Sequence, residues 1–171
     1  MIARKFLVLG SVLAALSTGA VRAQEVAPSD MLLATLWNQR SVEYRGVSLT
    51  VFAFAKIRLD QALADKSWTA APAEQKGDYQ NLPPAVVLDV DETLLDNSLY
   101  QAWMMRTGQT FSTKTWNEFC DAQISRAVPG SVEFTKYADS KGVKVFYVTN
   151  RGTEVEKATR ENMEKIGRAH V

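Results

Sequence analysis

Apolar residues between positions 30 and 66 recur at three- and four-residue spacing, which predicts helix over this stretch. Asp30 is placed to cap its start, and Gly46 is placed to divide it into two helices. The recurring positions are Leu33, Leu36, Trp37, Tyr44, Val47, Val51, Phe54, Ile57 and Leu63. Residues 67–84 contain proline and glycine breakers and predict a loop. Residues 24–84 are therefore expected to form an N-terminal helical region with its loop.

Two short apolar runs predict strands, at residues 85–90 and 142–149. The first run follows a pair of prolines and is apolar without alternation, which is typical of a strand buried on both faces of a parallel sheet. A helix is predicted over 131–140, immediately before the second run. Parallel strands need such a crossover, so the pattern predicts an α/β fold.

The segment between the first strand and this helix, residues 97–128, is too long for a simple connection. It contains helical stretches around 99–106 and 115–122. We interpret it as an inserted helical cap that covers a site. A further, highly charged helix is predicted over 153–165, after the second strand.

Three carboxylates, those of Asp89, Asp91 and Glu92, crowd the end of the first predicted strand. Carboxylates this close repel each other and are costly to desolvate, so a metal ion or a reaction is expected to offset the cost. Ligands of open α/β sheets bind beyond the carboxyl ends of the strands. Thr149 and Asn150 end the second strand, so their side chains are expected to face the same crevice.

Other polar residues have simpler interpretations. Glu92 and Asp96 are interpreted as caps for the helix that follows the strand, because acidic groups favour a helix N-terminus. The same role is the alternative for Asp89 with Asp91. Arg151 is interpreted as a surface charge, with a phosphate contact as its alternative.

The composition bears on the core and on two candidate residues, Cys120 and Trp116. Hydrophobic residues make up 46% of the 171 residues, enough for a packed core. The single cysteine, Cys120, has only His170 as a conceivable catalytic partner, and is interpreted as a small buried hydrophobe. Trp116, in the insertion, is interpreted either as part of the aromatic core of the cap or as a platform for an aromatic leaving group.

Residues 1–23 have the layout of a secretory signal: a basic start, the apolar run 6–16 and small residues before a cleavage point. The apolar run is short for a membrane span, and no lipidation cysteine follows it, so no stable membrane anchor is predicted. An uncleaved N-terminal anchor is the alternative. Without residues 1–23, which hold three bases and no acid, 17 basic residues face 19 acidic ones, a net charge of −2. This charge balance argues against a nucleic-acid partner. The signal-like layout of residues 1–23 predicts an exported protein, periplasmic or secreted.

The D-x-D-x-T pattern of Asp89, Asp91 and Thr93 resembles the first motif of the haloacid dehalogenase-like hydrolases, and Thr149 resembles their second. The words LDVDETLLDN, AVPG at 127–130 and VFYVTNR resemble the class C bacterial acid phosphatases. The resemblance covers residues 31–167. It implies a Rossmannoid parallel sheet, of which residues 85–171 hold a part, with an N-terminal helical region and a cap at about 97–128.

The resemblance also implies roles for the site residues. Asp89 would be the nucleophile that takes the phosphoryl group of a small phosphomonoester, such as a nucleoside monophosphate, to form an aspartyl-phosphate. Mg²⁺ would be held by Asp89 and the backbone carbonyl of Asp91. The Asp91 carboxylate would protonate the leaving alcohol and then activate water. Thr93, Thr149 and Asn150 would bind the substrate. By its position in the insertion, Trp116 would stack on a base or an aromatic leaving group.

The family also needs a lysine and an acidic metal-binding pair downstream, and neither is found before residue 171. The tail Ile166–Val171 resembles a translated sequencing adapter, which indicates an incomplete gene model. The alternatives are therefore an inactive truncated fragment or a non-catalytic module that binds phosphate or metal. A cytosolic sugar phosphatase, whose N-terminus only imitates a signal, is the remaining alternative. A sheet cut after two core strands is expected to leave an apolar edge unpaired.

Overall fold

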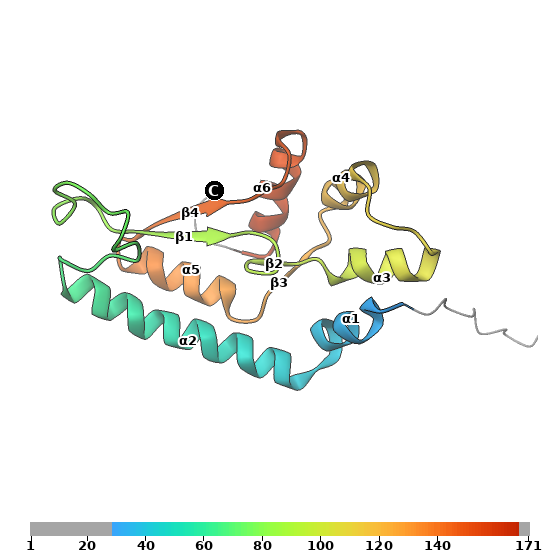
Figure 1. Ribbon diagram of the computed structural model, residues 1–171, viewed down its shortest axis with the longest axis horizontal. Coiled ribbons are helices and arrows are strands. Elements are labelled where there is room, and N and C mark those ends of the chain that lie inside the picture. The colour runs from blue at the N-terminus through green and yellow to red at the C-terminus, as the bar shows by residue number, and fades with distance from the viewer. Residues whose placement is uncertain (1–28, 168–171) are drawn as a thin grey trace, which may run out of the picture.

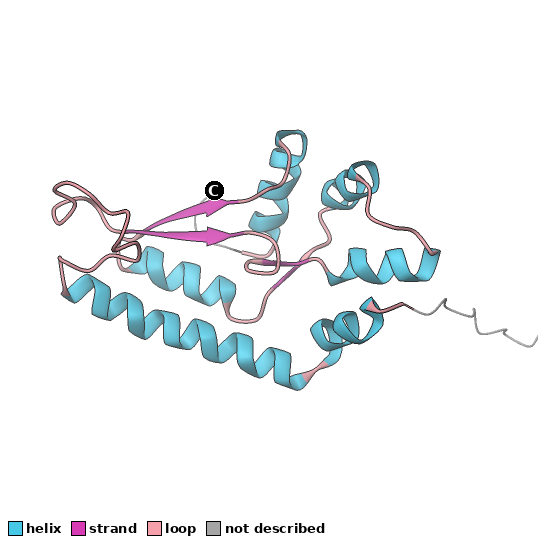
Figure 2. Ribbon diagram, viewed as in Figure 1, coloured by secondary structure: helices cyan, strands magenta, loops and turns pink. Residues whose placement is uncertain are grey.

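The computed structural model describes residues 29–167, so the predicted signal at 1–23 and the adapter-like residues 168–171 lie outside the described range (Figure 1). The elements run in the order α1 (Met31–Arg40), α2 (Val42–Ala64), β1 (Ala85–Asp89), β2 (Leu95–Asp96), α3 (Ser98–Thr107), α4 (Thr113–Ala122), β3 (Arg126–Ala127), α5 (Ser131–Ser140), β4 (Lys144–Val148), the 3-10 turn η1 (Thr153–Val155) and α6 (Glu156–Lys165). This alternation of strands and helices, with parallel strands at its centre, confirms the predicted α/β class (Figure 2). No helix within residues 29–167 is long and apolar enough to span a bilayer.

The predicted N-terminal helical region is present, but its break lies at Ser41, so the expectation for Gly46 is wrong. Ser41 is extended and its hydroxyl accepts the N–H of Tyr44 at 3.0 Å, which caps α2. Gly46 sits inside α2, where a glycine costs about 1 kcal/mol but does not end a helix. Asp30 makes no capping bond with its side chain, because the hydroxyl of Ser29 accepts the first N–H of α1 instead.

β1 and β4 form a parallel pair in which Ala85 is opposite Lys144 and Asp89 is opposite Val148. The predicted strands are confirmed, slightly shorter than their apolar runs. α5 precedes β4 as the expected crossover. It begins after Gly130, whose φ of +88° favours glycine, and a Cβ there would lie 3.1 Å from that of Phe52 in α2. This glycine therefore lets α5 start close against α2.

Only one face of this sheet is covered by described residues. Val86, Leu88, Val145 and Tyr147 pack against a cluster that includes Leu59 of α2 and Phe134 and Ala138 of α5. Figure 1 shows α5 and α2 on the same side of the two strands. On the other face Val87, Phe146 and Val148 remain 66%, 50% and 61% exposed. Burial on both faces of the first strand was therefore a wrong expectation for the described residues, which pack against one face of the sheet.

The insertion contains both expected helices, as α3 and α4, and has its own aromatic core. The ring of Tyr100 is 4% exposed and lies 5.2 to 6.3 Å from four other rings. Those rings belong to Trp103, Phe111, Trp116 and Phe119. Cys120, at the end of α4, is 1% exposed, and burial raises the pKa of its thiol. The interpretation of Cys120 as a buried hydrophobe is confirmed.

Candidate active site at the carboxyl ends of β1 and β4

The turn after β1 holds the acidic motif at the end of the sheet. Val90 is buried, and its carbonyl accepts the N–H groups of Leu94 and Leu95 at 2.9 and 2.8 Å. Both leucines are fully buried and pack with Met163 of α6. Glu92 has a φ of 54°, which is costly for a residue with a Cβ, by about 1 to 2 kcal/mol. The buried leucines and the closing hydrogen bonds hold the turn in this conformation and so fix the direction of Asp91.

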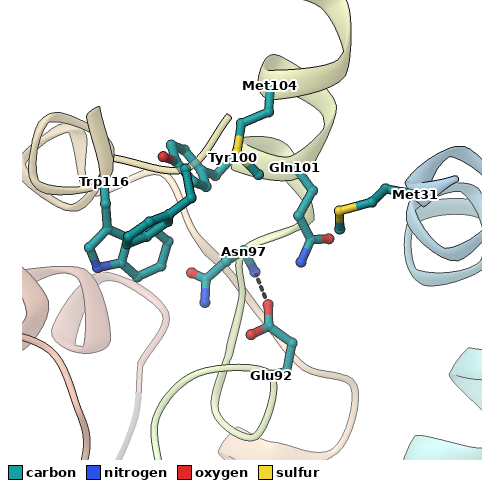
Figure 3. A pocket seen from close by; sticks show the side chains of 8 residues that line it. Met31, Glu92, Asn97, Tyr100, Gln101, Met104 and Trp116 are labelled. Atoms are coloured by element: carbon teal, nitrogen blue, oxygen red, sulfur yellow. Dashed lines mark hydrogen bonds between the residues drawn. The ribbon is translucent and has the colours of Figure 1, made fainter. Parts of the chain in front are cut away.

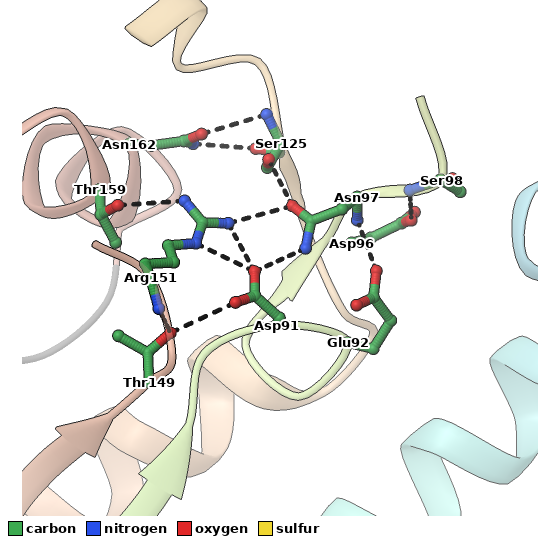
Figure 4. Close-up of polar contacts among 10 residues, drawn as sticks. All are labelled: Asp91, Glu92, Asp96, Asn97, Ser98, Ser125, Thr149, Arg151, Thr159 and Asn162. Carbon is green, nitrogen blue, oxygen red and sulfur yellow. Dashed lines mark hydrogen bonds and ion pairs between the residues drawn. The ribbon is translucent and has the colours of Figure 1, made fainter. Parts of the chain in front are cut away.

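The structure brings Asp91 and Thr149 together, as expected for residues at the same edge of a parallel pair. Thr149 Oγ1 donates to Asp91 Oδ2 at 3.3 Å (Figure 4). The same hydroxyl accepts the backbone N–H of Arg151 at 3.2 Å. The backbone N–H of Arg151 therefore orients the Thr149 hydroxyl so that it points toward Asp91 in the acidic turn.

The remaining predicted site residues lie outside this network. Asp89 is the last residue of β1 and is exposed, and its side chain makes no hydrogen bond with any described residue. Asn150 is exposed and Thr93 is half-buried, and neither side chain has a hydrogen-bond partner within residues 29–167. The register places Asp89 at the same sheet edge as Thr149, one pair before it. Their chemical roles stay predictions.

Arg151 is buried, so its interpretation as a surface charge is wrong. Its side chain is 2% exposed, and its Nη2 lies 2.7 Å from Asp91 Oδ1. Its Nε donates to the same oxygen at 3.0 Å. The guanidinium also lies 5.2 Å from the ring centroid of Trp116, at a cation–π distance. A base three residues after β4 and an acid two residues after β1 are brought together by the parallel register.

Four further polar residues, which sequence reasoning missed, surround this ion pair: Asn97, Ser125, Thr159 and Asn162 (Figure 4). Asn97 donates its amide N–H to Asp91 at 2.7 Å and accepts from Arg151 at 3.1 Å. Its oxygen also accepts the hydroxyl of Ser125 at 2.8 Å. The one sequence signal is that Thr159 and Asn162 are three apart and share a face of an otherwise charged helix.

Glu92 and Asp96 act at the start of α3, as interpreted from the sequence. Asp96 Oδ1 accepts the N–H of Ser98 at 2.9 Å, and Glu92 Oε1 accepts that of Asn97 at 3.1 Å. Desolvation raises the pKa of Glu92, the nearby charges of Asp91 and Asp96 add to this, and the bonds from Asn97 oppose it. These two acids are therefore bound to backbone and are poor candidates for chemistry.

A cavity of about 190 Å³ opens beside the acidic turn, between α1, α3 and α4 (Figure 3). Its wall is mostly apolar and aromatic and is formed by Met31, Glu92, Asn97, Tyr100, Gln101, Met104, Phe111 and Trp116. Trp116 packs in the aromatic core of the cap and also lines this cavity. The geometry therefore fits both interpretations of this residue.

A parallel α/β sheet with an acidic motif at one strand end, a threonine at the next and a helical cap above them is the architecture of a haloacid dehalogenase (HAD) hydrolase. The sequence matches the HAD superfamily, subfamily IIIB (acid phosphatase), over residues 4–171. The chain therefore belongs to that family, as the resemblance implied.

Two solved structures are similar to this chain. One is the crystal structure of the class C acid phosphatase from Bacillus anthracis with tungstate bound, at 36% identity and a TM-score of 0.69. The other is the structure of the class C acid phosphatase from Bacillus anthracis, at 35% identity and the same TM-score. Each match covers 82% of this chain and 53% of the other. The chain thus spans about half the length of these relatives.

Proposed function

We propose that the protein is an exported, Mg²⁺-dependent acid phosphatase that hydrolyses small phosphomonoesters through an aspartyl-phosphate. The observation that carries the proposal is the contact of Thr149 with Asp91 at the edge of the sheet where Asp89 ends β1. Membership of an acid phosphatase family supports it. The similar protein with tungstate bound adds support, because tungstate is an oxyanion, as phosphate is.

The residues present divide the chemistry between two carboxylates. The Asp89 side chain is exposed and accepts no hydrogen bond from a described residue, so its carboxylate oxygen is available to attack phosphorus. Asp91 is oriented by hydrogen bonds and supplies the proton that the departing alcohol needs, then takes one from the water that cleaves the intermediate. Thr149 offers its hydroxyl to a phosphoryl oxygen.

The donor set is suitable for Mg²⁺, which prefers oxygen ligands and needs only one or two protein carboxylates beside water and phosphate. The Asp89 carboxylate and the Asp91 backbone carbonyl would hold it. Within residues 29–167 no group of three or more His, Cys, Asp and Glu side chains forms a cage. When bound, the ion would neutralise charge between the nucleophile and the phosphate.

The test uses a protein chain that continues to the length of the solved relatives. We expect it to hydrolyse p-nitrophenyl phosphate with Mg²⁺, to lose activity with EDTA and to regain it when Mg²⁺ is restored. Asp89→Asn should abolish turnover and the acid-stable phosphoryl label on the protein, whereas Asp78→Asn, in an exposed loop, should change neither. Full activity of Asp89→Asn contradicts the nucleophile, and phosphate or Mg²⁺ binding without turnover would favour the non-catalytic module.

Export is tested separately, on cells that make the protein. We expect activity in the periplasm or medium and a mature N-terminus near Gln24. An intact Met1 in a cytosolic protein would favour the alternative of a cytosolic sugar phosphatase.

Nucleoside monophosphates are the substrate class that the aromatic wall supports. Trp116 lines the cavity beside the acidic turn, where a base can stack on it. Trp116→Leu is therefore expected to raise KM for a nucleoside 5′-monophosphate and to leave KM for glycerol phosphate unchanged. Equal changes for both substrates would assign Trp116 to the core of the cap alone.

A further inference from the structure

We propose that Arg151 is a positioning residue for Asp91: it holds one carboxylate oxygen and leaves the other for proton exchange with the substrate. This inference rests on the proposed phosphatase function. It differs from both sequence-based interpretations of Arg151, because the side chain is neither a surface charge nor arranged as a phosphate contact.

The two oxygens of Asp91 are used unequally. Oδ1 accepts three hydrogen bonds, from Asn97 Nδ2 at 2.7 Å, Arg151 Nη2 at 2.7 Å and Arg151 Nε at 3.0 Å. Among the described residues Oδ2 accepts one long bond, from Thr149 at 3.3 Å, at the edge of the sheet where the substrate is expected. A carboxylate oxygen has two lone pairs, so Oδ1 is saturated and Oδ2 is the oxygen left to exchange a proton.

Arg151 is itself held on every side by the protein. Four of its five N–H donors are engaged, two with Asp91, one with Asn97 and one with Thr159 at 3.1 Å. Its side chain is 2% exposed, and Trp116 lies over the guanidinium. An arginine that clamps phosphate keeps a free pair of donors for a bidentate contact, and the described residues leave this one a single donor.

The frame around Arg151 is rigid because it is tied to backbone. Asn162 of α6 accepts the N–H of Ser125 at 3.1 Å and donates to its carbonyl at 2.9 Å. The hydroxyl of Ser125 then fixes Asn97, which contacts both Asp91 and Arg151 (Figure 4). Asn97, Ser125 and Asn162 are all buried. The insertion and α6 thus hold the pair in one orientation.

The consequence lies in the first half-reaction. The bond from phosphorus to Asp89 forms while the bond from phosphorus to the leaving oxygen breaks, and the proton on Asp91 Oδ2 moves to that oxygen. An alkoxide leaves poorly and needs this proton, whereas 2,4-dinitrophenolate leaves without it. A correctly placed general acid contributes about 10² to 10⁴ in rate. Misplacing Asp91 should therefore harm alkyl phosphates far more than dinitrophenyl phosphate.

The experiment compares these two esters in the protein of full relative length, with wild type, Arg151→Lys and Arg151→Gln. Lysine keeps the charge but loses the planar fork. Because Asp91 also activates the water of the second half-reaction, which both esters share, the rates are measured in the first turnover. We expect the rate of glycerol release to fall about 10²-fold, the rate of 2,4-dinitrophenolate release to fall less than about threefold, and KM for both esters to change little. Arg160→Gln, an exposed residue of α6, is the matched control and should leave both rates unchanged.

Thr159→Val provides a milder variant should the arginine variants not fold, because it removes only the bond to Nη1. The same selective loss, of smaller size, is expected. Equal losses for both esters would overturn the inference and assign Arg151 a purely structural role. A rise in KM at constant kcat would overturn it in favour of a phosphate contact. If wild type hydrolyses neither ester, the phosphatase proposal fails and the inference fails with it.

Discussion

Thr149 and Asp91 are 58 positions apart in the sequence, and the hydroxyl of one lies 3.3 Å from the carboxylate of the other. The contact exists because β1 and β4 run in parallel and end at the same edge. A buried turn after β1 aims Asp91 at this edge, and the backbone N–H of Arg151 orients Thr149 from the other side. The candidate site therefore depends on two strand ends being in register.

Replacing Thr149 tests whether its hydroxyl contributes to catalysis. Thr149→Val removes the one donor to Asp91 Oδ2 within residues 29–167 and a donor to the phosphoryl group, while keeping the shape of the side chain. We expect kcat/KM for p-nitrophenyl phosphate to fall about 10²-fold, as for the loss of one preorganised donor. Thr149→Ser keeps the hydroxyl and should retain most activity. If valine and serine behave alike, the hydroxyl has no catalytic part.

The double hydrogen bond between Asn162 and the backbone of Ser125 predicts a stability effect. Asn162→Leu leaves a buried N–H and a buried carbonyl unpaired, and each costs about 1 to 3 kcal/mol. We expect the free energy of unfolding, measured with urea, to fall by about 3 kcal/mol. Glu164→Gln, exposed on the same helix, should change it by less than about 0.5 kcal/mol. Equal effects would show that Ser125 finds other partners.

Asp60 predicts a pH dependence at the contact of α2 with α5. The hydroxyl of Tyr137 donates to both oxygens of Asp60, and Lys141 lies 3.3 Å away. The Tyr137 bonds, and then Lys141, lower the pKa of Asp60 from its ordinary 3.8, while desolvation opposes them. The folded state therefore favours the charged form, so this stabilisation is present above pH 3.8 and is lost as pH falls through the folded pKa.

Asp60→Asn should therefore lower the melting temperature at pH 7, and the difference from wild type should shrink as the pH falls below about 4. Thermal unfolding followed by circular dichroism across pH 3 to 7 measures this. Asp78→Asn, in the exposed loop, is the matched control and should show no such trend. A difference that stays constant with pH would contradict the role of the Asp60 charge.

The exposed face of the sheet predicts that this chain binds hydrophobic dyes and self-associates. Val87 and Phe146 are opposite each other and are 66% and 50% exposed. Clustered exposed apolar groups bind dyes and other chains. We expect Phe146→Thr to lower binding of the dye ANS and self-association in size-exclusion chromatography. Leu82→Thr, at a residue that is 65% exposed but lies in a loop, should have little effect. Unchanged dye binding in Phe146→Thr would show that ANS binds to another apolar surface of the chain.

Local pattern was sufficient to predict β1, β4, α5 and the two helices of the insertion, because each follows from its own periodicity and breakers. The meeting of Asp91 with Thr149 also followed from sequence, since ligands and polar groups gather where parallel strands end. Both inferences need only information carried by neighbouring residues and one general rule of sheet topology.

Tertiary structure alone decided the rest. The sequence alone indicates a surface charge at Arg151, and only the fold shows that it pairs with Asp91, 60 residues away. The sequence likewise indicates an ordinary polar helix position at Asn162, and only the fold shows its hydrogen bond with Ser125. One-sided burial of β1 likewise depends on where α2 and α5 pack. A charge or amide is stable inside only when its partner is present, and that partner comes from a distant part of the chain. The sequence by itself therefore determined the elements and the strand-end motif, and packing decided which polar groups became buried pairs.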